Sequence, residues 1–267
     1  MNKRAVLILL LGCAMLAGLL PAASQPVQAR EAPVIRLEAL YSRAHNPEHF
    51  TQGLFFHGDY LYESTGLYGQ SLLARIDPQT GRTLAQVELG GAYFGEGAVL
   101  AEGHIYVLTW QERTAFVFNP DSLKLEGWFA YSGEGWGLTY DGRRLIRSDG
   151  TNTLYFHGLD GKPQGTLAVY DHGEPVHNLN ELEWVPEQNL ILANIWGEGR
   201  IAAIDAGSGK VSFWLDMADL VPPDLRGDGQ YVPNGLALAP DGKTLWLTGK
   251  LWPVIFAVAW PPKIPSP

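Results

Sequence analysis

Cysteine is almost absent from this sequence, since the one cysteine among 267 residues is Cys13. Disulfide frameworks and thiolate zinc sites need several cysteines, so the sequence excludes both. Basic residues are also scarce: 19 Lys and Arg face 28 Asp and Glu, which gives a formal net charge of −9. An acidic chain is a poor ligand for phosphate backbones, so we expect no nucleic-acid partner.

The familiar catalytic signatures are missing as well. No Gly-x-Ser-x-Gly motif, P-loop or dinucleotide-binding fingerprint occurs. His45 and His49 stand four residues apart, but Pro47 between them argues against a helical metal pair. The acids and histidines of residues 171–177 match no strong metal-binding spacing, and we interpret them as a solvated loop. We therefore predict no metal ligands and no required cofactor.

The N-terminus has the pattern of an export signal. Its apolar run is too short, and too soon followed by Pro21, for a membrane span. Cys13 in Leu-Leu-Gly-Cys resembles a lipoprotein-processing site, but it falls early in that run. We predict a signal peptide over 1–29, one domain over 30–267, and an exported, periplasmic or extracellular monomer without stable membrane insertion. The signal consists of a basic pair (Lys3-Arg4), the apolar run (5–20) and a small-x-small cleavage site (27–29).

Turn-forming residues, by contrast, are abundant, with 31 Gly and 18 Pro. A hairpin of two short apolar strands around a tight turn recurs five times, and further strands such as 83–89 follow it. The turns recur in phase, which argues against a β-sandwich. We predict an all-β, five-bladed β-propeller, with residues 221–231 as an inserted loop. The hairpins span 52–64, 96–109, 136–148, 181–195 and 234–248.

Propeller geometry gathers the ends of these hairpins at one face of the ring. The first strand of a blade lines the channel and the second runs back beside it, so the start of one and the end of the other lie together. Their side chains would form an aromatic-walled pocket with a few polar groups, as small-molecule sites do. The entry positions hold Gln52, Glu96, Trp136, Glu181 (with Asn180) and Asn234, and the exit positions hold Thr65, Trp110, Asp149, Trp196 and Lys250.

Each of these positions also has a purely structural interpretation. The tryptophans could plug the end of the channel, Asp149 and Asn234 suit turns, and the other amides could satisfy backbone groups. Lys250 has unusually apolar neighbours for a solvated lysine. Glu96 stands between two glycines and follows two aromatic residues, an environment that raises a carboxyl pKa towards a value useful for proton transfer. These two residues are the strongest functional candidates.

Motifs through nearly all of the mature chain resemble the plant-type glutaminyl-peptide cyclotransferases, a family of plants and bacteria. The stretches LYESTGLYGQS (61–71) and LNELEW (179–184) are the most specific of them. The other matching stretches are FTQGLFF (50–56), FGEG (94–97), LTWQE (108–112), GEGWGL (133–138), SDGT (148–151), ANIWGE (193–198), PNGLA (233–237) and TGKLWP (248–253).

This resemblance implies a five-bladed propeller that is unrelated to the zinc-dependent animal enzymes. It implies that the N-terminal Gln of a peptide or protein substrate is cyclised to pyroglutamate with release of ammonia. Some members hold a structural calcium ion near the propeller centre, which this sequence neither requires nor excludes. Carried over motif by motif, the resemblance implies Glu96, Lys250, Gln52 and Asn180 as catalytic residues and Phe50, Phe94, Trp110, Trp136 and Trp196 as substrate-binding residues.

Two other functions stay open at this point. One is a non-catalytic propeller that binds a peptide N-terminus or a small ligand. The other is a metal-dependent lactonase or esterase, which would need several inward acids and Asn residues around one ion. Lys250 and the Trp cluster at one mouth argue against the second alternative.

Overall fold

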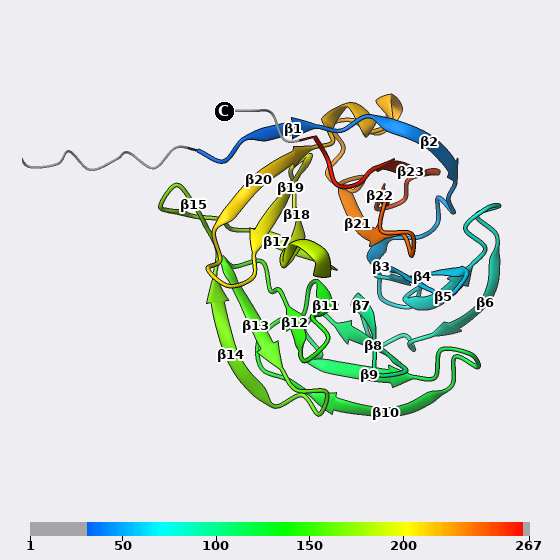
Figure 1. The fold of residues 1–267 in the computed structure, drawn as a ribbon. Coiled ribbons are helices and arrows are strands. Elements are labelled where there is room, and N and C mark those ends of the chain that lie inside the picture. Colours follow the sequence, from blue (N-terminus) through cyan, green and yellow to red (C-terminus); the bar gives the residue numbers. More distant parts are fainter. Residues whose placement is uncertain (1–30, 264–267) are drawn as a thin grey trace, which may run out of the picture.

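The structure, a computed structural model, describes residues 31–263. The signal peptide predicted for 1–29, with Cys13, lies outside these residues. Five sheets radiate from a common centre, and the chain passes from one to the next around the ring (Figure 1). This arrangement confirms the predicted all-β, five-bladed propeller.

The first three blades each consist of four consecutive antiparallel strands, ordered from the centre outwards. In each blade the first two strands are a predicted hairpin. The first blade holds β3 (Thr51–His57), β4 (Tyr60–Thr65), β5 (Leu72–Ile76) and β6 (Thr83–Glu88). The second holds β7 (Gly95–Ala101), β8 (His104–Thr109), β9 (Thr114–Phe118) and β10 (Leu125–Ala130). The third holds β11 (Leu138–Tyr140), β12 (Leu145–Arg147), β13 (Thr153–His157) and β14 (Pro163–Ala168).

The last two blades include strands from the N-terminus. β1 pairs in parallel with β20 at the edge of the fourth blade, and β2 pairs antiparallel with β23 as the outer strand of the fifth. The predicted repeats did not include this closure of the ring by β2. The fourth blade holds β17 (Leu179–Val185), β18 (Leu190–Ile195), β19 (Arg200–Asp205), β20 (Val211–Asp216) and β1 (Val34–Arg36), and the fifth holds β21 (Pro233–Leu238), β22 (Thr244–Gly249), β23 (Val254–Ala259) and β2 (Ala39–Ala44).

Short elements lie between the strands of this ring. Within the described residues the helices are 3-10 turns, and none is long and apolar enough to cross a membrane. Two of them lie in the segment between β20 and β21, which contains the inserted loop predicted over 221–231. The helices are η1 (Pro186–Gln188), η2 (Ala218–Leu220) and η3 (Pro223–Leu225), and a small hairpin of β15 (Tyr170–Asp171) and β16 (Glu174–Pro175) follows the third blade.

The hydrophobic core lies between neighbouring blades. Strand β3 is buried along most of its length, whereas the outer strand β6 alternates between half-buried and exposed residues. One apolar cluster joins Phe55 of the first blade to Val107 of the second, and another joins Leu54 to Trp246 of the fifth. Each blade therefore packs both of its faces, and the inner strands become a rigid base for side chains at the mouth of the ring.

Candidate active site

One cavity of about 430 Å³ is lined by all nine residues that the family motifs imply as catalytic or substrate-binding. All five blades contribute to it, so residues spread over most of the chain meet at one mouth. The amides, the acid and the lysine are buried, while Trp196 is exposed. The lining consists of Phe50, Gln52, Phe94, Glu96, Trp110, Trp136, Asn180, Trp196 and Lys250.

Irregularities at the start of four inner strands aim these polar side chains. The ladder shifts register between Thr51 and Gly53, so Gln52 is an extra residue there. It shifts again around Glu96 and around Asn180, and also in β21. Such bulges break the strict alternation of a strand and re-aim a side chain. In three of these four strands the residue at the bulge, Gln52, Glu96 or Asn180, lines the cavity.

Glycines beside these bulges let neighbouring inner strands touch. A Cβ on Gly97 would lie 2.4 Å from the Leu138 nitrogen and 2.6 Å from the Trp136 oxygen. A Cβ on Gly53 would lie 2.3 Å from the Ala98 nitrogen. Because no side chain fits in these contacts, the glycines after Gln52 and Glu96 are a requirement of the close approach between blades.

Aromatic rings form the walls of the cavity. The Phe94 ring centroid lies 6.1 Å from that of Phe50 and 5.6 Å from that of Trp110, and Trp136 lies 6.1 Å from Trp196, all edge to face. Such pairs hold flat apolar surfaces at fixed angles. The cavity can therefore pack the aliphatic part of a small substrate and exclude water from it.

Glu134 orients two of these walls and was missed in the sequence. Its Oε2 accepts hydrogen bonds from the indole Nε1 of Trp110 at 2.7 Å and of Trp136 at 3.0 Å. Its Oε1 accepts one from Gln111 at 3.2 Å. Glu134 belongs to the family motif GEGWGL (133–138). The spacing of residues in that motif does not show that one carboxylate reaches indoles of two blades.

Burial shifts both ionisable groups of the cavity towards their neutral forms. Glu96 is buried, and this desolvation raises its pKa well above the usual value, while the charge of Lys250 opposes the shift. Burial also lowers the pKa of Lys250 to about 8, against the effect of Glu96. The Lys250 Nζ lies 4.7 Å from the centroid of the Phe50 ring, a cation–π contact that favours the charged form.

The two amides present different groups. Asn234 donates from Nδ2 to the Gln52 Oε1 at 3.2 Å, so the Gln52 amide NH2 is left as a donor for the cavity. The Asn180 Oδ1 is buried and has no hydrogen-bond partner. A buried acceptor without a partner is costly, and a ligand N–H would satisfy it. The cavity thus offers an acid, a cation, an amide donor and an amide acceptor.

Comparison with known proteins agrees with this geometry. A family model described as Glutamine cyclotransferase matches residues 10–260. The chain belongs to the glutamine cyclotransferase family. A glutaminyl-peptide cyclotransferase of Arabidopsis thaliana is 36% identical over 232 residues, which cover 83% of this chain and 70% of the relative. The solved structure of Myxococcus xanthus glutaminyl cyclase is 34% identical, with a TM-score of 0.79 over 85% of this chain and 97% of that one.

Four residues expected at the mouth do not line the cavity of this glutamine cyclotransferase. The Glu181 carboxylate instead accepts hydrogen bonds from the main-chain nitrogens of Leu54, at 3.3 Å, and Leu236, at 2.9 Å. The bulge in β17 turns Asn180 to the mouth, and its neighbour Glu181 bonds to the inner strands of two other blades. Asn234 donates to Thr51 and Gln52 of the first blade, while Thr65 and Asp149 bond locally, to Leu72 and Thr151.

Residues 171–177 differ in part from the solvated loop that was predicted. Asp171 is buried, and its Oδ2 accepts a hydrogen bond from the Trp214 indole at 2.8 Å. Its Oδ1 accepts one from the Ala32 nitrogen at 3.1 Å. Asp171 therefore attaches the start of the described chain to the fourth blade, whereas Glu174 and His177 are exposed as expected.

A cluster of His45, His49 and Glu63 could hold a metal ion. Their ligand atoms lie within 4.8 Å of one another, and all three residues are buried. The Glu63 carboxylate accepts from His49 Nδ1 at 2.7 Å and from the Thr51 hydroxyl at 2.7 Å, and it lies 3.1 Å from His45 Nε2. Pro47 does exclude a helix here, as expected, but Glu63 from β4 completes the group. Two imidazoles and one carboxylate are ligand types that suit a transition metal such as zinc, but here they bond to one another, and His45 Nδ1 also lies 2.6 Å from the Trp252 oxygen.

Calcium, which some members of the family hold near the propeller centre, needs a different set of ligands. It takes six to eight oxygen atoms. At the centre of the ring, both oxygens of Glu181 accept main-chain amide hydrogen bonds, and so does Oε1 of Glu183. These carboxylates already have partners in the fold. Among the described residues, this donor set does not fit a calcium ion.

Proposed function

We propose a mechanism for this protein as a glutaminyl-peptide cyclotransferase. This acyltransferase converts the N-terminal glutamine of a peptide to pyroglutamate and releases ammonia. The family match over most of the chain and the two relatives of that name support the activity. The observation that carries the mechanism is the burial of Glu96 and Lys250 in one aromatic cavity.

The chemistry is intramolecular, so the cavity must mainly fold the substrate and move protons. The α-amine nitrogen of the substrate attacks the carbon of its own side-chain amide. A new C–N bond closes the five-membered ring, and the old C–N bond breaks to release ammonia. The aromatic walls hold the aliphatic part of the Gln side chain in a bent conformation that brings the amine to the amide.

Glu96 moves the proton in this scheme. As a carboxylate it takes a proton from the attacking nitrogen, and as the acid it gives a proton to the leaving nitrogen, so it ends unchanged. A group that both accepts and donates works best when its pKa lies near the working pH. Burial raises the pKa of Glu96 in that direction.

The other three polar residues stabilise and orient the reacting amide. The Lys250 ammonium and the Gln52 amide donate hydrogen bonds to the oxygen that becomes negative in the tetrahedral intermediate. The Asn180 Oδ1, which lacks a partner, accepts an N–H of the substrate. Loss of one oxyanion donor typically costs about two to three powers of ten in kcat.

An ammonia-release assay on Gln-Ala, with and without a chelator, tests the proposal. We expect ammonia release that the chelator leaves unchanged, because no step uses a metal. Binding of Gln-Ala without ammonia would instead indicate a non-catalytic propeller. Ammonia release that is lost with the chelator and restored by zinc would place the His45–His49–Glu63 cluster in the reaction.

We also propose that the protein acts outside the cytoplasm. The basic pair, the apolar run and the small-x-small site before residue 30 support export. Cell fractionation followed by N-terminal sequencing would test it. A mature chain that starts near residue 30 is expected in the periplasm or medium, whereas protein found in the cytoplasm alone, with an intact Met1, would contradict export.

A further inference from the structure

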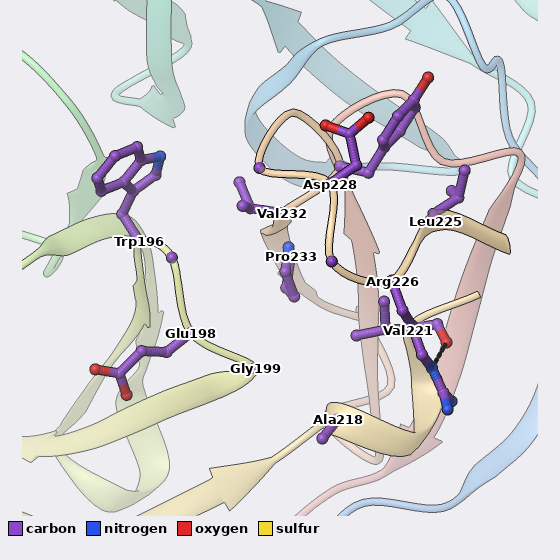
Figure 2. Close-up of a pocket in the computed structure, with 14 residues that line it drawn as sticks. Trp196, Glu198, Gly199, Ala218, Val221, Leu225, Arg226, Asp228, Val232 and Pro233 are labelled. Atoms are coloured by element: carbon purple, nitrogen blue, oxygen red, sulfur yellow. Dashed lines mark hydrogen bonds between the residues drawn. The ribbon is translucent and has the colours of Figure 1, made fainter. Parts of the chain in front are cut away.

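A second cavity, of about 480 Å³, lies beside the candidate active site (Figure 2). It is lined by the turn after β18 and by the segment between β20 and β21. Trp196 lines both cavities, and among the nine residues of the first it is the exposed one, with 46% of its surface accessible. Trp196 therefore stands where the two cavities meet.

The backbone connects the two cavities on the side of the fifth blade as well. The Lys250 nitrogen donates to the Val232 oxygen at 3.0 Å, and Pro233 pairs with Gly249. Val232 and Pro233 line the second cavity, whereas Lys250 lines the first. We call the second cavity the 218–233 groove, after the segment that forms most of it.

The groove has an apolar floor. Val221, Leu225 and Tyr231 are half-buried and pack against the core between the fourth and fifth blades. In Figure 2, the turn that carries Trp196 and Glu198 lies across an open space from the 218–233 segment, and the Glu198 carboxylate points away from that segment. A flat apolar floor of this kind can accept a hydrophobic side chain at the side of an extended peptide.

Charge at the groove is predominantly acidic. Glu198 and Asp228 are exposed there, and Asp228 uses its Oδ1 for the nitrogen of Gln230. Arg226 also lines the groove, but it donates to the main-chain oxygens of Val221 and Asp219. Arg226 keeps its positive charge, but the two acids outnumber it, and Asp228 is the acid of the 218–233 segment that can attract a cation.

We propose that the 218–233 groove binds the substrate residues that follow the N-terminal glutamine. The inference rests on the proposed function, because a peptide whose Gln side chain fills the first cavity must continue outwards from it. The chain leaves past Trp196 and lies along the groove in an extended form. The groove favours an apolar side chain, which packs on Val221 and Leu225, together with a basic residue, which Asp228 attracts.

Peptide length and side-chain chemistry test the proposal. The probes are Gln-Ala, Gln-Ala-Ala-Ala, Gln-Leu-Ala-Ala, Gln-Ala-Leu-Ala and the same leucine peptides with a terminal Lys. We expect kcat/KM to rise about tenfold from Gln-Ala-Ala-Ala to the better leucine peptide, mainly through KM, since about 1.4 kcal/mol of apolar burial corresponds to that factor. The terminal Lys should lower KM further, and salt should weaken this effect.

Matched variants assign these effects to the groove. Leu225→Ser should remove most of the gain from leucine and leave Gln-Ala kinetics unchanged, whereas Leu125→Ser, on the exposed outer strand β10, should change neither. Asp228→Asn should remove the gain from Lys, whereas Asp224→Asn, an exposed acid of the same segment outside the groove lining, should not.

Two failures are distinguishable. If Gln-Ala itself releases no ammonia, the proposed function is wrong. If Gln-Ala is turned over but all peptides have the same kcat/KM, or if Leu225→Ser lowers Gln-Ala and the leucine peptides equally, the groove does not bind substrate.

Discussion

At the residue scale, Glu96 and Lys250 are set apart by their low exposure in a cavity that opens to solvent. Each is buried and held by a bulge or a loop of an inner hairpin, and burial moves the pKa of each towards the neutral form. The burial that causes these shifts lowers the free energy of unfolding, since a buried ionisable group is costly. Both shifts suit proton transfer near neutral pH.

The exchange Glu96→Gln removes the proton-transfer group and keeps its shape. We expect kcat on Gln-Ala to fall by at least about 10²-fold, because general acid–base catalysis contributes about that much or more. Ammonia release measures the loss, and denaturant unfolding should show an unchanged or higher midpoint because a buried acid is replaced. Near-normal turnover by this variant would remove Glu96 from the mechanism.

The pH dependence of kcat/KM follows from the same two groups, because it reports the pKa values of the free enzyme. Burial lowers the pKa of Lys250 to about 8, so kcat/KM should fall as the pH rises past that value and the ammonium is lost. The pKa of Glu96 is raised well above 4.5, so kcat/KM should rise with pH through a range above that value as the carboxylate forms. Rates at low concentrations of Gln peptide measure both limbs.

Lys250→Arg is the control for the alkaline limb. A guanidinium stays protonated at these pH values. Its residual activity should therefore show no fall near pH 8, whereas a fall identical to that of the wild type would assign the alkaline limb to another group.

Glu134 can be tested by two substitutions that separate its charge from its hydrogen bonds. Its negative charge raises the pKa of Glu96, so Glu134→Gln should move the acidic limb of the kcat/KM profile to lower pH. The Gln oxygen can still accept from both indoles, so KM should change little. Glu134→Ala should move the limb in the same way and also raise KM several-fold, because Trp110 and Trp136 lose their shared acceptor. Equal KM values for the two variants would contradict the orienting role.

At the scale of the elements, the inner strands decide which way each entry residue faces. In β17, the register shift between Leu179 and Leu182 sends Asn180 to the cavity and Glu181 to the main chain of two other blades. Glu181 bonds to Leu54 and Leu236, so one carboxyl group connects the first, fourth and fifth blades. Its role is therefore structural, although it stands next to a predicted catalytic residue.

The isosteric exchange Glu181→Gln tests this division. Both oxygens accept a main-chain N–H, and an amide has only one acceptor oxygen. One buried N–H would face an NH2 group, and we expect a loss of about 1–3 kcal/mol in the free energy of unfolding. Urea unfolding measures it, with kcat per folded molecule unchanged. A variant of normal stability without turnover would instead place Glu181 in the active site.

At the scale of the whole molecule, strand β2 closes the ring. It pairs with β23 from Ala39 opposite Val258 to Ala44 opposite Val254, and thereby joins the two ends of the described chain. Without it β23 would be an unpaired edge. The cavity draws residues from all five blades, so its geometry depends on the closed ring.

Two truncated chains separate the effect of closing the ring with β2 from the effect of merely shortening the chain. A chain that begins at residue 38 lacks β1 and keeps β2, whereas one that begins at residue 45 lacks both. We expect the second to unfold at least about 5 °C below the first. This difference corresponds to about 1–3 kcal/mol of lost stability, since each kcal/mol shifts Tm by about 2–4 °C at this size. Calorimetry and ammonia release would show this. Equal Tm values would mean that β2 does not stabilise the ring.

The sequence by itself determined the five hairpins and the residues at their ends. A hairpin is local, because its turn and two strands are adjacent in the chain, and the phase of the repeats places equivalent residues at one mouth. The cavity lining, from Phe50 to Lys250, agrees with the residues that the family motifs single out, whereas four of the ten hairpin-end positions given by the repeats lie outside it. The blade count follows from the same periodicity.

Only the tertiary structure decided which side chains from different blades meet. Glu134 reaches the indoles of Trp110 and Trp136, and Glu63 joins His45 and His49 although each of these residues is ordinary in sequence. Strand β2 pairs with β23 more than 200 residues away, as Ala44 opposite Val254 shows. Such contacts depend on the closure and packing of the ring, and no local pattern encodes a partner on another blade.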